Sequence, residues 1–389
     1  MSTPCGIDTA VATLALASHR SSFTELPALV AREAARAGLP EARLFIADRQ
    51  ERFLREVTGE GPDAHRGGAE MRVDGTVAGL AYTKGEPVRV DRGHRCWVPV
   101  LDGTERLGVL HVANEGEPDF EAMRILASMV GLLVVDKRAN SDAYARLIRT
   151  RPMSVSAEMQ WSLMPPSTFA NTRVTISAAT EPAYDNAGDA FDYALSGDIA
   201  HLAMFDAMGH DNAAGLLANL TVGVFRNERR RGTELEAIPR AVETMLTEEF
   251  ARTRFTTAVM GELNMATGDL AWVNCGHLPP VLIRGGKAHE LECEPSHPLG
   301  TELGLPVTVC HEQLEPGDRL LLYTDGMIEA RDAQGREFGL DRFVDFVIRH
   351  DADRLPVPET LRRLVQALMN YHHGRLDDDA TVLFCEWHG

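Results

Sequence analysis

Residues 185–212 read DNAGDAFDYALSGDIAHLAMFDAMGHDN and decide the fold of the region around them. Acidic pieces flank the apolar run 199–205, which is typical of a β-strand. Leu202, Met204 and Asp206 share one parity in that run. A strand here would therefore carry an apolar face directly into a carboxylate at its end.

The preceding residues form a second strand candidate that ends in a tight turn. Asp189 shares parity with Phe191 and Tyr193, and residues 196–198 (Ser-Gly-Asp) favour a hairpin that brings Asp189 next to Asp206. Two carboxylates held close repel each other, and a hard divalent cation relieves that repulsion. The alternative, two solvated aspartates beside turns, stays open on this stretch alone.

Length and composition indicate a globular chain of about two or three domains. The sequence has 389 residues, of which 44% are hydrophobic and 25% are charged. Its formal net charge of −18 argues against a nucleic-acid-binding surface, which would need clustered Lys and Arg. We therefore expect no nucleic-acid partner.

The cysteines and the apolar runs predict a cytoplasmic location. No Cys-x-x-Cys pair occurs among the six cysteines, so we expect neither a zinc site nor a disulfide framework, and a reducing compartment. No positive charge precedes the apolar patch 10–17, which argues against a signal peptide. The longest apolar run, 129–135, is too short to span a bilayer, so we expect no membrane partner.

The N-terminal third alternates helical and strand-like segments. A helix is expected over 24–37 with Thr24 as its cap, and the other expected elements are a strand at 43–48, a short helix at 75–81, strands at 96–101 and 107–112 around a turn, and a helix over 119–137. Together with Val77-Ala-Gly79, Glu86-Pro-Val88, Val98-Pro-Val100 and Leu107-Gly-Val-Leu110, this order resembles a GAF domain. The resemblance implies a six-stranded α/β fold that senses a small molecule or mediates dimerisation.

Residues 138–168 favour a helical linker, interrupted at Pro152, between a GAF-like domain at 1–137 and a second domain at 169–389. Beyond residue 168 the sequence predicts many short strands. Two helical candidates, at 213–227 and 235–250, lie between the first strands and the later ones. This order favours an α+β sheet sandwich covered by helices.

Two more acidic sites border strands in the second domain. Parity puts Leu321, Tyr323 and Asp325 on one strand face, with Gly326 as the exit turn, and the run 377–384 (DDDATVLF) places acids before a buried strand. Carboxylates converging from remote strands would suit Mg²⁺ or Mn²⁺. A pair of such ions, roughly 3.5–4 Å apart, can generate a hydroxide nucleophile and clamp a phosphoryl group.

The second domain also resembles a known family, the metal-dependent protein serine/threonine phosphatases of type 2C (PPM), in their bacterial SpoIIE-like group. The matching pieces cover about residues 155–387 in the family's order: Gln160-Trp-Ser-Leu-Met-Pro-Pro166, Ala187-Gly-Asp-Ala-Phe-Asp192, Asp206-Ala-Met-Gly-His210, Asn274-Cys-Gly-His-Leu-Pro-Pro280, Pro298-Leu-Gly300, Leu322-Tyr-Thr-Asp-Gly326, Arg336-Glu-Phe-Gly339 and Asp378-Asp-Ala-Thr381.

The resemblance implies an αββα sandwich with two Mn²⁺ or Mg²⁺ ions at one end of the sheets. Asp206 would bridge the metals, Asp325 and Asp378 would complete the first metal's ligands, and Asp189 would hold the second with the backbone carbonyl of Ala207. Asp206 and Asp189 are thus the implied catalytic residues. Because Asp377, Asp378 and Asp379 follow one another, the sequence leaves open which of them is the metal ligand. Asp379 is the nearest substitute for Asp378. A metal-bound water would attack phosphorus without a phosphoenzyme.

Departures from the family pattern touch this site. Ala187 replaces a glycine before Asp189, and Asp211 adds a negative charge after the Gly-His step. His210 and His277 are acid/base candidates, although a loop histidine more often serves packing, and Gly276 with the prolines after His277 indicates a structural turn. Rival chemistries lack their motifs: no Cys-x-x-x-x-x-Arg, no P-loop Gly-Lys-Ser/Thr and no Gly-x-Ser-x-Gly occur.

The sequence therefore predicts a metal-dependent phosphoserine/phosphothreonine protein phosphatase. By family analogy its partner would be a phosphorylated anti-sigma-factor antagonist, and the GAF-like domain with the linker would form a homodimer. The alternative is a regulatory binding module that senses a ligand through the GAF-like domain without useful turnover.

Overall fold

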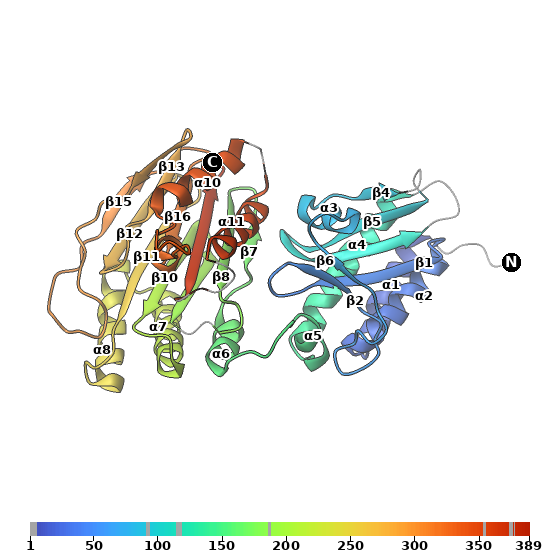
Figure 1. Ribbon diagram of the computed structural model, residues 1–389, viewed down its shortest axis with the longest axis horizontal. Coiled ribbons are helices and arrows are strands. Elements are labelled where there is room, and N and C mark those ends of the chain that lie inside the picture. Colours follow the sequence, from blue (N-terminus) through green and yellow to red (C-terminus); the bar gives the residue numbers. More distant parts are fainter. Residues whose placement is uncertain are drawn as a thin grey trace. The chain divides into compact units, whose positions relative to one another are not determined.

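The structure, a computed structural model, describes residues 6–90, 94–113, 119–185, 188–352, 355–372, 376 and 378–389. Its internal contacts divide the chain into two compact units, 1–152 and 153–389. The division falls inside the segment predicted as a linker. Each unit is described by itself below (Figure 1).

The first unit is built on one antiparallel sheet of six strands in the order β3-β2-β1-β6-β5-β4. Its strands are β1 (Glu41–Ala47), β2 (Phe53–Glu56), β3 (Glu70–Arg72), β4 (Val88–Val90), β5 (Arg95–Asp102) and β6 (Glu105–Ala113). Its helices are α1 (Ile7–Ser18), η1 (Phe23–Glu25), α2 (Leu26–Arg36), α3 (Val77–Lys84), α4 (Phe120–Arg138) and α5 (Asp142–Leu147).

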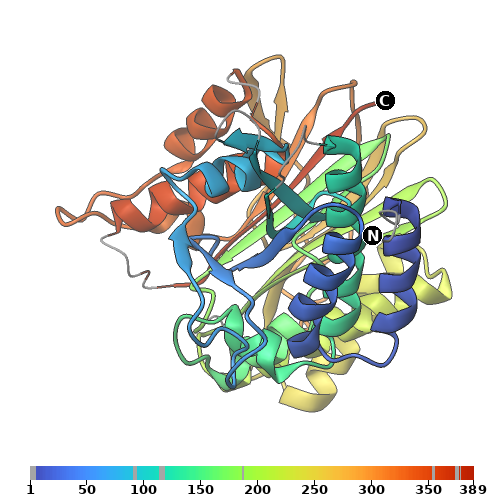
Figure 2. The ribbon, with the colours of Figure 1, turned by 90° about the vertical axis from the view of Figure 1, so that its right-hand side faces the viewer.

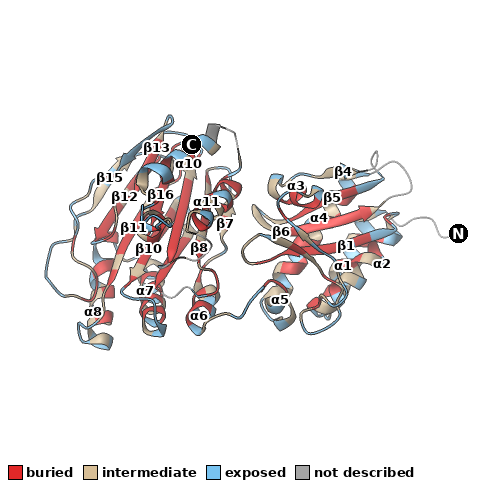
Figure 3. Ribbon diagram, in the orientation of Figure 1, coloured by how far each residue is buried: buried red, intermediate tan, exposed pale blue. Residues whose placement is uncertain are grey.

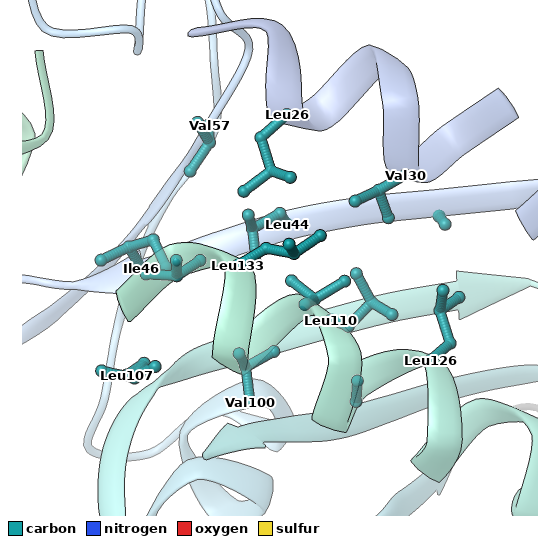
Figure 4. Close-up of a cluster of buried hydrophobic side chains, with 14 of the residues drawn as sticks. Leu26, Val30, Leu44, Ile46, Val57, Val100, Leu107, Leu110, Leu126 and Leu133 are labelled. Carbon is teal, nitrogen blue, oxygen red and sulfur yellow. The ribbon is translucent and has the colours of Figure 1, made fainter. Parts of the chain in front are cut away.

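Two apolar cores hold this sheet, one on each face. Residues of α1, α2 and α4 pack on one face, where Leu26, Leu44, Leu110 and Leu133 meet (Figure 4), whereas α3 covers the other face beside Phe45. Figure 2 shows α3 on the opposite side of the sheet from α1 and α2. The strands and helices expected in this region are present, and the GAF-like assignment of residues 1–137 stays a prediction.

One local expectation was wrong in this unit. The helical segment is capped by Ser22 and not by Thr24, because Ser22 and Glu25 form a reciprocal capping box at the start of η1. The Ser22 backbone N–H donates to Glu25 Oε2 at 2.7 Å. In a capping box the Ser side chain and the acid three residues later each accept from one backbone N–H at the helix start, an arrangement in which Thr24 does not take part.

The second unit contains two antiparallel sheets. One has the order β15-β12-β11-β10-β9 and the other β14-β13-β16-β17-β8-β7. The strands are β7 (Thr168–Ala170), β8 (Val174–Glu181), β9 (Asp189–Ser196), β10 (Ile199–Ala207), β11 (Thr256–Asn264), β12 (Asp269–Cys275), β13 (Val281–Arg284), β14 (Lys287–Glu290), β15 (Cys310–Gln313), β16 (Arg319–Tyr323) and β17 (Ala380–Trp387).

Helices cover both outer faces of this pair of sheets. They are α6 (Val155–Leu163), α7 (Asn212–Arg231), η3 (Leu235–Ala237), α8 (Ile238–Phe250), α9 (Gly326–Glu329), α10 (Leu340–Ala352) and α11 (Val357–Tyr371). α7 and α8 pack on the five-stranded sheet, α10 and α11 pack on the six-stranded sheet, and a third core fills the space between the sheets. The strands in the middle of the two sheets are mostly buried (Figure 3), whereas the edge strand β14 is exposed. The predicted α+β class and αββα sandwich are confirmed.

The predicted linker segment contains two short helices on either side of Pro152. α5 belongs to the first unit, whereas α6 belongs to the second and packs against α7. The indole N–H of Trp161 on α6 donates to the Ala183 carbonyl at 2.7 Å. α6 is therefore an integral part of the sandwich unit.

The cysteine expectation was wrong in one respect. Cys293 and Cys310 form a disulfide with their Cα atoms 5.8 Å apart, whereas Cys96, Cys275 and Cys385 are free and buried. The pair is separated by 17 residues, and a long loop folds back to place β15 beside β12. Sequence spacing alone cannot reveal such a return. Among the described helices, none is both long and apolar enough to cross a membrane.

Candidate functional site

The hairpin of β9 and β10 has the predicted register. Asp189 and Asp206 are directly opposed across the two strands, and the turn contains Gly197 with a φ of 59°. Phe191 and Met204, which share the parity of these aspartates, lie in the core between the sheets. Both carboxylates therefore stand where the apolar face of the hairpin ends.

Asp325 reaches the same end of the sandwich by a route that parity did not predict. Leu321 and Tyr323 face α10 and α11, and β16 ends at Tyr323. Asp325 then lies at the N-cap of α9. Gly326 is required by close approach and not by a turn, because a Cβ there would lie 2.0 Å from the Asp379 carbonyl oxygen.

The acidic run before β17 supplies two described carboxyls. Asp379 is buried and accepts a hydrogen bond from the Gly188 backbone N–H at 2.7 Å. Asp378 is exposed and accepts from the Asp379 N–H at 2.9 Å. Asp377 and Ala187, two positions that the sequence left open, lie outside the described residues.

Burial and neighbouring carboxyl groups raise the pKa values of three of these aspartates, which shows that the side chains form one cluster around Asp206. Burial, followed by the charges of Asp325, Asp378 and Asp379, raises the pKa of Asp206 to about 7. Burial, followed by Asp206 and Asp379, raises the pKa of Asp189 well above its usual range. Burial and then Asp378 raise the pKa of Asp325. Asp206 is the residue common to both halves of the cluster.

Two polar residues that the sequence analysis quoted without a role hold Asp189. The Thr324 hydroxyl donates to Asp189 Oδ2 at 2.6 Å and accepts from the Thr381 N–H at 2.9 Å. Gln160 on α6 donates through Nε2 to the Asp189 carbonyl at 2.9 Å, and both groups are buried. The signal available in the sequence was position alone, since Thr324 immediately precedes Asp325.

Gly188 brings the β9 and β10 backbones together at Ala207. A Cβ on Gly188 would lie 2.7 Å from the carbonyl oxygens of Ala207 and Gly209. The Ala207 N–H donates to the Gly188 carbonyl at 3.1 Å. The predicted carbonyl ligand, Ala207 O, therefore lies so close to residue 188 that only glycine fits there without a shift of the backbone.

The extra charge of Asp211 is balanced within the same loop. Its carboxylate accepts from the Ala214 N–H at 2.8 Å, which caps α7, and pairs with Arg254 at 3.0 Å. These contacts, the Ala214 hydrogen bond first, lower the pKa of Asp211. Arg254 also donates to the Met208 carbonyl at 3.1 Å. Asp211 thus fixes the loop after β10.

The two candidate histidines differ in environment. His277 is buried, its Nε2–H donates to the Tyr323 carbonyl at 3.0 Å, and its Nδ1 accepts from the Thr257 hydroxyl at 2.7 Å. Burial lowers its pKa to about 4, so the ring is neutral near pH 7. Asn274 brackets the His277 backbone with two hydrogen bonds, which confirms the structural turn. His210 is exposed.

The cluster has the chemistry of a hard-cation site. Among the described residues, no group of three or more His, Cys, Asp or Glu is arranged as preformed metal ligands. Yet the donors gathered around Asp206 are all carboxyl or carbonyl oxygens, which are the ligands that Mg²⁺ and Mn²⁺ prefer. The mutual repulsion of the carboxyls is the strain that a divalent cation would relieve.

A family model described as stage II sporulation protein E (SpoIIE) matches residues 196–388. Residues 196–388 belong to the SpoIIE family. The SpoIIE-family region includes β10, β16, β17 and all of the acidic cluster except Asp189 on β9. The matched region therefore covers the elements that carry or adjoin Asp206, Asp325 and Asp378.

Curated relatives of the SpoIIE-family region include phosphatases. Protein IcfG of Synechocystis is 24% identical over 241 residues, which cover 54% of this chain and 37% of IcfG. Phosphoserine phosphatase RsbU of Bacillus subtilis is 20% identical over 244 residues, covering 59% of this chain and 68% of RsbU. Phosphoserine phosphatase RsbP of the same organism is 24% identical, covering 55% and 52%. The chain thus spans little more than a third of IcfG and about half of RsbP.

Solved structures share the fold of the sandwich unit. The SiaA-PP2C domain of Pseudomonas aeruginosa matches with a TM-score of 0.52 and 20% identity, covering 59% of this chain and 93% of that one. The RsbU and RsbW domains of Rv1364c from Mycobacterium tuberculosis match with a TM-score of 0.50 and 24% identity, covering 56% and 62%. At these identities the likeness establishes the PP2C fold.

Proposed function

We propose that the sandwich unit is a Mn²⁺- or Mg²⁺-dependent phosphoserine/phosphothreonine protein phosphatase. The observation that carries the proposal is the convergence of five carboxyls from three separate segments: Asp189 and Asp206 in the β9–β10 hairpin, Asp325 at the start of α9, and Asp378 and Asp379 before β17. The similarity to RsbU and RsbP, which are phosphoserine phosphatases, supports the same reaction class.

In this proposal each half of the cluster would hold one metal ion. Asp206, Asp325 and Asp378 would hold one ion, and Asp206, Asp189 and the Ala207 carbonyl would hold the other. Bound there, the ions would supply Lewis-acid activation of water and neutralisation of phosphate charge. Asp378 suits a ligand on the solvent side because it is exposed, whereas Asp379 is engaged with the Gly188 N–H.

The surrounding residues would keep this centre in one geometry. Thr324 orients the Asp189 carboxylate and Gln160 fixes its backbone. The neutral His277 ties the Tyr323 carbonyl, two residues before Asp325, to Thr257, which is opposite Asp206 in the sheet. Half-buried Asp206 and exposed Asp378 leave one side of the cluster open for a phosphorylated side chain.

We further propose a phosphorylated anti-sigma-factor antagonist as the substrate, in the cytoplasm. Residues 1–137 would act as a GAF-like sensor and, with the 138–168 linker, form a homodimer. A pocket of about 600 Å³ in the first unit supports a ligand-sensing role. It lies beside the α3–β4 turn, β5 and α4, and its lining includes Glu86, Leu101, Arg124 and Ser128.

Hydrolysis of a small aryl phosphate by the purified full chain tests the proposal. We expect activity that requires Mn²⁺ or Mg²⁺, disappears with chelator and is abolished in Asp206→Ala. Residues 153–389 should be assayed in parallel, because activity confined to that fragment would mean that the first unit inhibits the enzyme. Absence of metal-dependent hydrolysis from both forms would refute the phosphatase and favour the binding module.

A further inference from the structure

A long loop joins β14 to β15, and its two ends are tied together by the Cys293–Cys310 disulfide. We call residues 294–309 the rim loop. It packs beside α8 along one side of the sandwich unit (Figure 1), and a Cβ on Gly300 would lie 3.3 Å from the Cβ of Leu246 on α8. None of the roles assigned above to the acidic cluster involves this loop.

The rim loop is anchored directly beside the acidic cluster. Leu299 and Thr256 exchange two backbone hydrogen bonds, of 2.9 and 2.8 Å. Thr256 is the strand partner of Ala207, and the next residue, Thr257, is the partner of Asp206. The loop therefore forms an isolated β-bridge with β11, at the end of the five-stranded sheet that carries the carboxylates.

Further polar contacts fix the tip of the loop. The Glu243 carboxylate on α8 accepts from the N–H groups of Gly300 and Glu302. The Leu305 N–H donates to His297 Nδ1 at 3.2 Å, and the Leu305 carbonyl accepts from the Ser296 hydroxyl at 3.3 Å. The chain between these anchors is thus held from both sides.

This fixed tip presents two large apolar side chains to solvent. Leu303 is 67% exposed and Leu305 is 51% exposed, and they are one residue apart across Gly304. Single exposed leucines are common on protein surfaces. A pair held out on a hydrogen-bonded, disulfide-closed tip beside a candidate catalytic centre is better explained by a partner that covers it.

The leucine pair lies within reach of a substrate bound at the cluster. Four residues span at most about 14 Å, and each paired-strand step adds about 5 Å, so Leu303 lies within about 24 Å of Ala207. The neighbouring Glu302 pairs with Arg252, two residues before the Arg254 that clamps the loop after β10. A protein partner that covers about 800 Å², roughly 30 Å across, would touch both places.

We propose that Leu303 and Leu305 form a docking surface for an apolar segment that flanks the phosphoserine or phosphothreonine of the protein substrate. The inference rests on the proposed phosphatase function and adds a substrate preference to it. Because the segment binds outside the acidic cluster, it should contribute to recognition of long substrates and not to hydrolysis of small ones.

The test uses the full chain with Mn²⁺ and a series of phosphoserine peptides. A pair of leucines is moved from two to about eight residues from the phosphoserine on either side, since about 24 Å corresponds to about seven extended residues. The parent peptide carries serines at those positions. An aryl phosphate, which is too small to reach the loop, reports the catalytic centre in every variant.

We expect one leucine placement to raise kcat/KM about tenfold or more over the parent peptide. Leu303→Ser with Leu305→Ser should remove that preference while aryl phosphate hydrolysis persists. Leu132→Ser, which changes a 56% exposed leucine on α4, serves as the matched control and should retain the preference.

Three results would overturn the docking surface. They are the absence of any leucine preference in the unmodified chain, its persistence in the double variant, and a change of oligomeric state on light scattering as the sole effect of that variant. The last result would assign the leucine pair to contact with a second copy. If the unmodified chain does not hydrolyse the aryl phosphate at all, the phosphatase function itself is refuted.

Discussion

At the scale of single residues, Asp206 carries an unfavourable electrostatic environment when no metal is bound. It lies opposite Asp189 in the hairpin, and burial, followed by the charges of three other carboxyls, raises its pKa to about 7. A carboxyl whose pKa is higher in the folded state than in the unfolded state destabilises the fold once both forms are ionised. The charge that would bind metal is therefore a cost to the metal-free protein.

Asp206→Asn should consequently stabilise the metal-free protein. The cost is absent below the unfolded pKa near 3.8, grows as pH rises and is complete above about 7. At pH 8 with chelator we expect a higher melting temperature than for the unmodified chain, by about 2–4 °C for each kcal/mol of repulsion removed. At pH 4 the two proteins should melt together, and addition of Mn²⁺ should reverse their order at pH 8.

His277 predicts a pH dependence of the opposite sign. Its pKa is near 6.5 when unfolded and about 4 when folded, so the unfolded chain takes up a proton first as pH falls. Stability that depends on the neutral ring is complete above 6.5 and declines toward pH 4, by about 3 kcal/mol over that range. His277→Gln should remove this component, measured as the difference between denaturation curves of the two proteins from pH 7.5 to 4.5. Parallel curves would contradict it.

At the scale of elements, α6 contacts the strand that carries Asp189 of the acidic cluster. Gln160 reaches the Asp189 backbone, and the Leu163 carbonyl at the helix end accepts from Arg226 at 2.6 Å. Arg226 also binds the buried Asp192 on β9 at 2.6 Å. Both contacts converge on β9, so a shift of α6 would be felt at Asp189.

Gln160→Ala should therefore weaken metal binding as well as the fold. Removal of the buried hydrogen bond should lower the free energy of unfolding by about 1–2 kcal/mol. It should also raise the Mn²⁺ concentration needed for half of the metal-induced rise in melting temperature. Ser162→Ala, on the exposed side of the same helix, is the control and should change neither quantity. Equal metal titrations for all three proteins would show that α6 does not position the site.

The disulfide of the rim loop makes a separate prediction at this scale. A disulfide that closes a loop of 17 residues lowers the conformational entropy of the unfolded chain, which stabilises the folded state by about 3 kcal/mol. Cys293→Ser and Cys310→Ser should each lose about that much stability in chemical denaturation. Dithiothreitol should produce the same loss in the unmodified chain and none in either variant. A loss in the variants that reductant does not reproduce would point to packing of the sulfur atoms instead.

At the scale of the whole molecule, the local parts of the site were predictable and the long-range parts were not. The hairpin that pairs Asp189 with Asp206 could be predicted because a short turn and strict alternation fix its register. The face of Asp325 could not, since α9 begins where parity would continue and packs its Gly326 against the Asp379 carbonyl. The return of the rim loop to form Cys293–Cys310 is likewise a tertiary event without a local signal.

β17, the last strand in sequence, runs between β16 and β8 in the middle of its sheet. It pairs with β8 across about two hundred residues of chain, from Ala380 against Glu181 to Trp387 against Val174. Pairing these two strands closes a very long loop, and the entropy lost in that step opposes formation of the middle of the sheet. Asp378 and Asp379 immediately precede β17, so we expect the acidic cluster to be completed only once this strand has paired. A chain that has not yet paired this strand would carry the hairpin aspartates without these partners, so divalent-cation affinity should appear only together with the central pairing of this sheet.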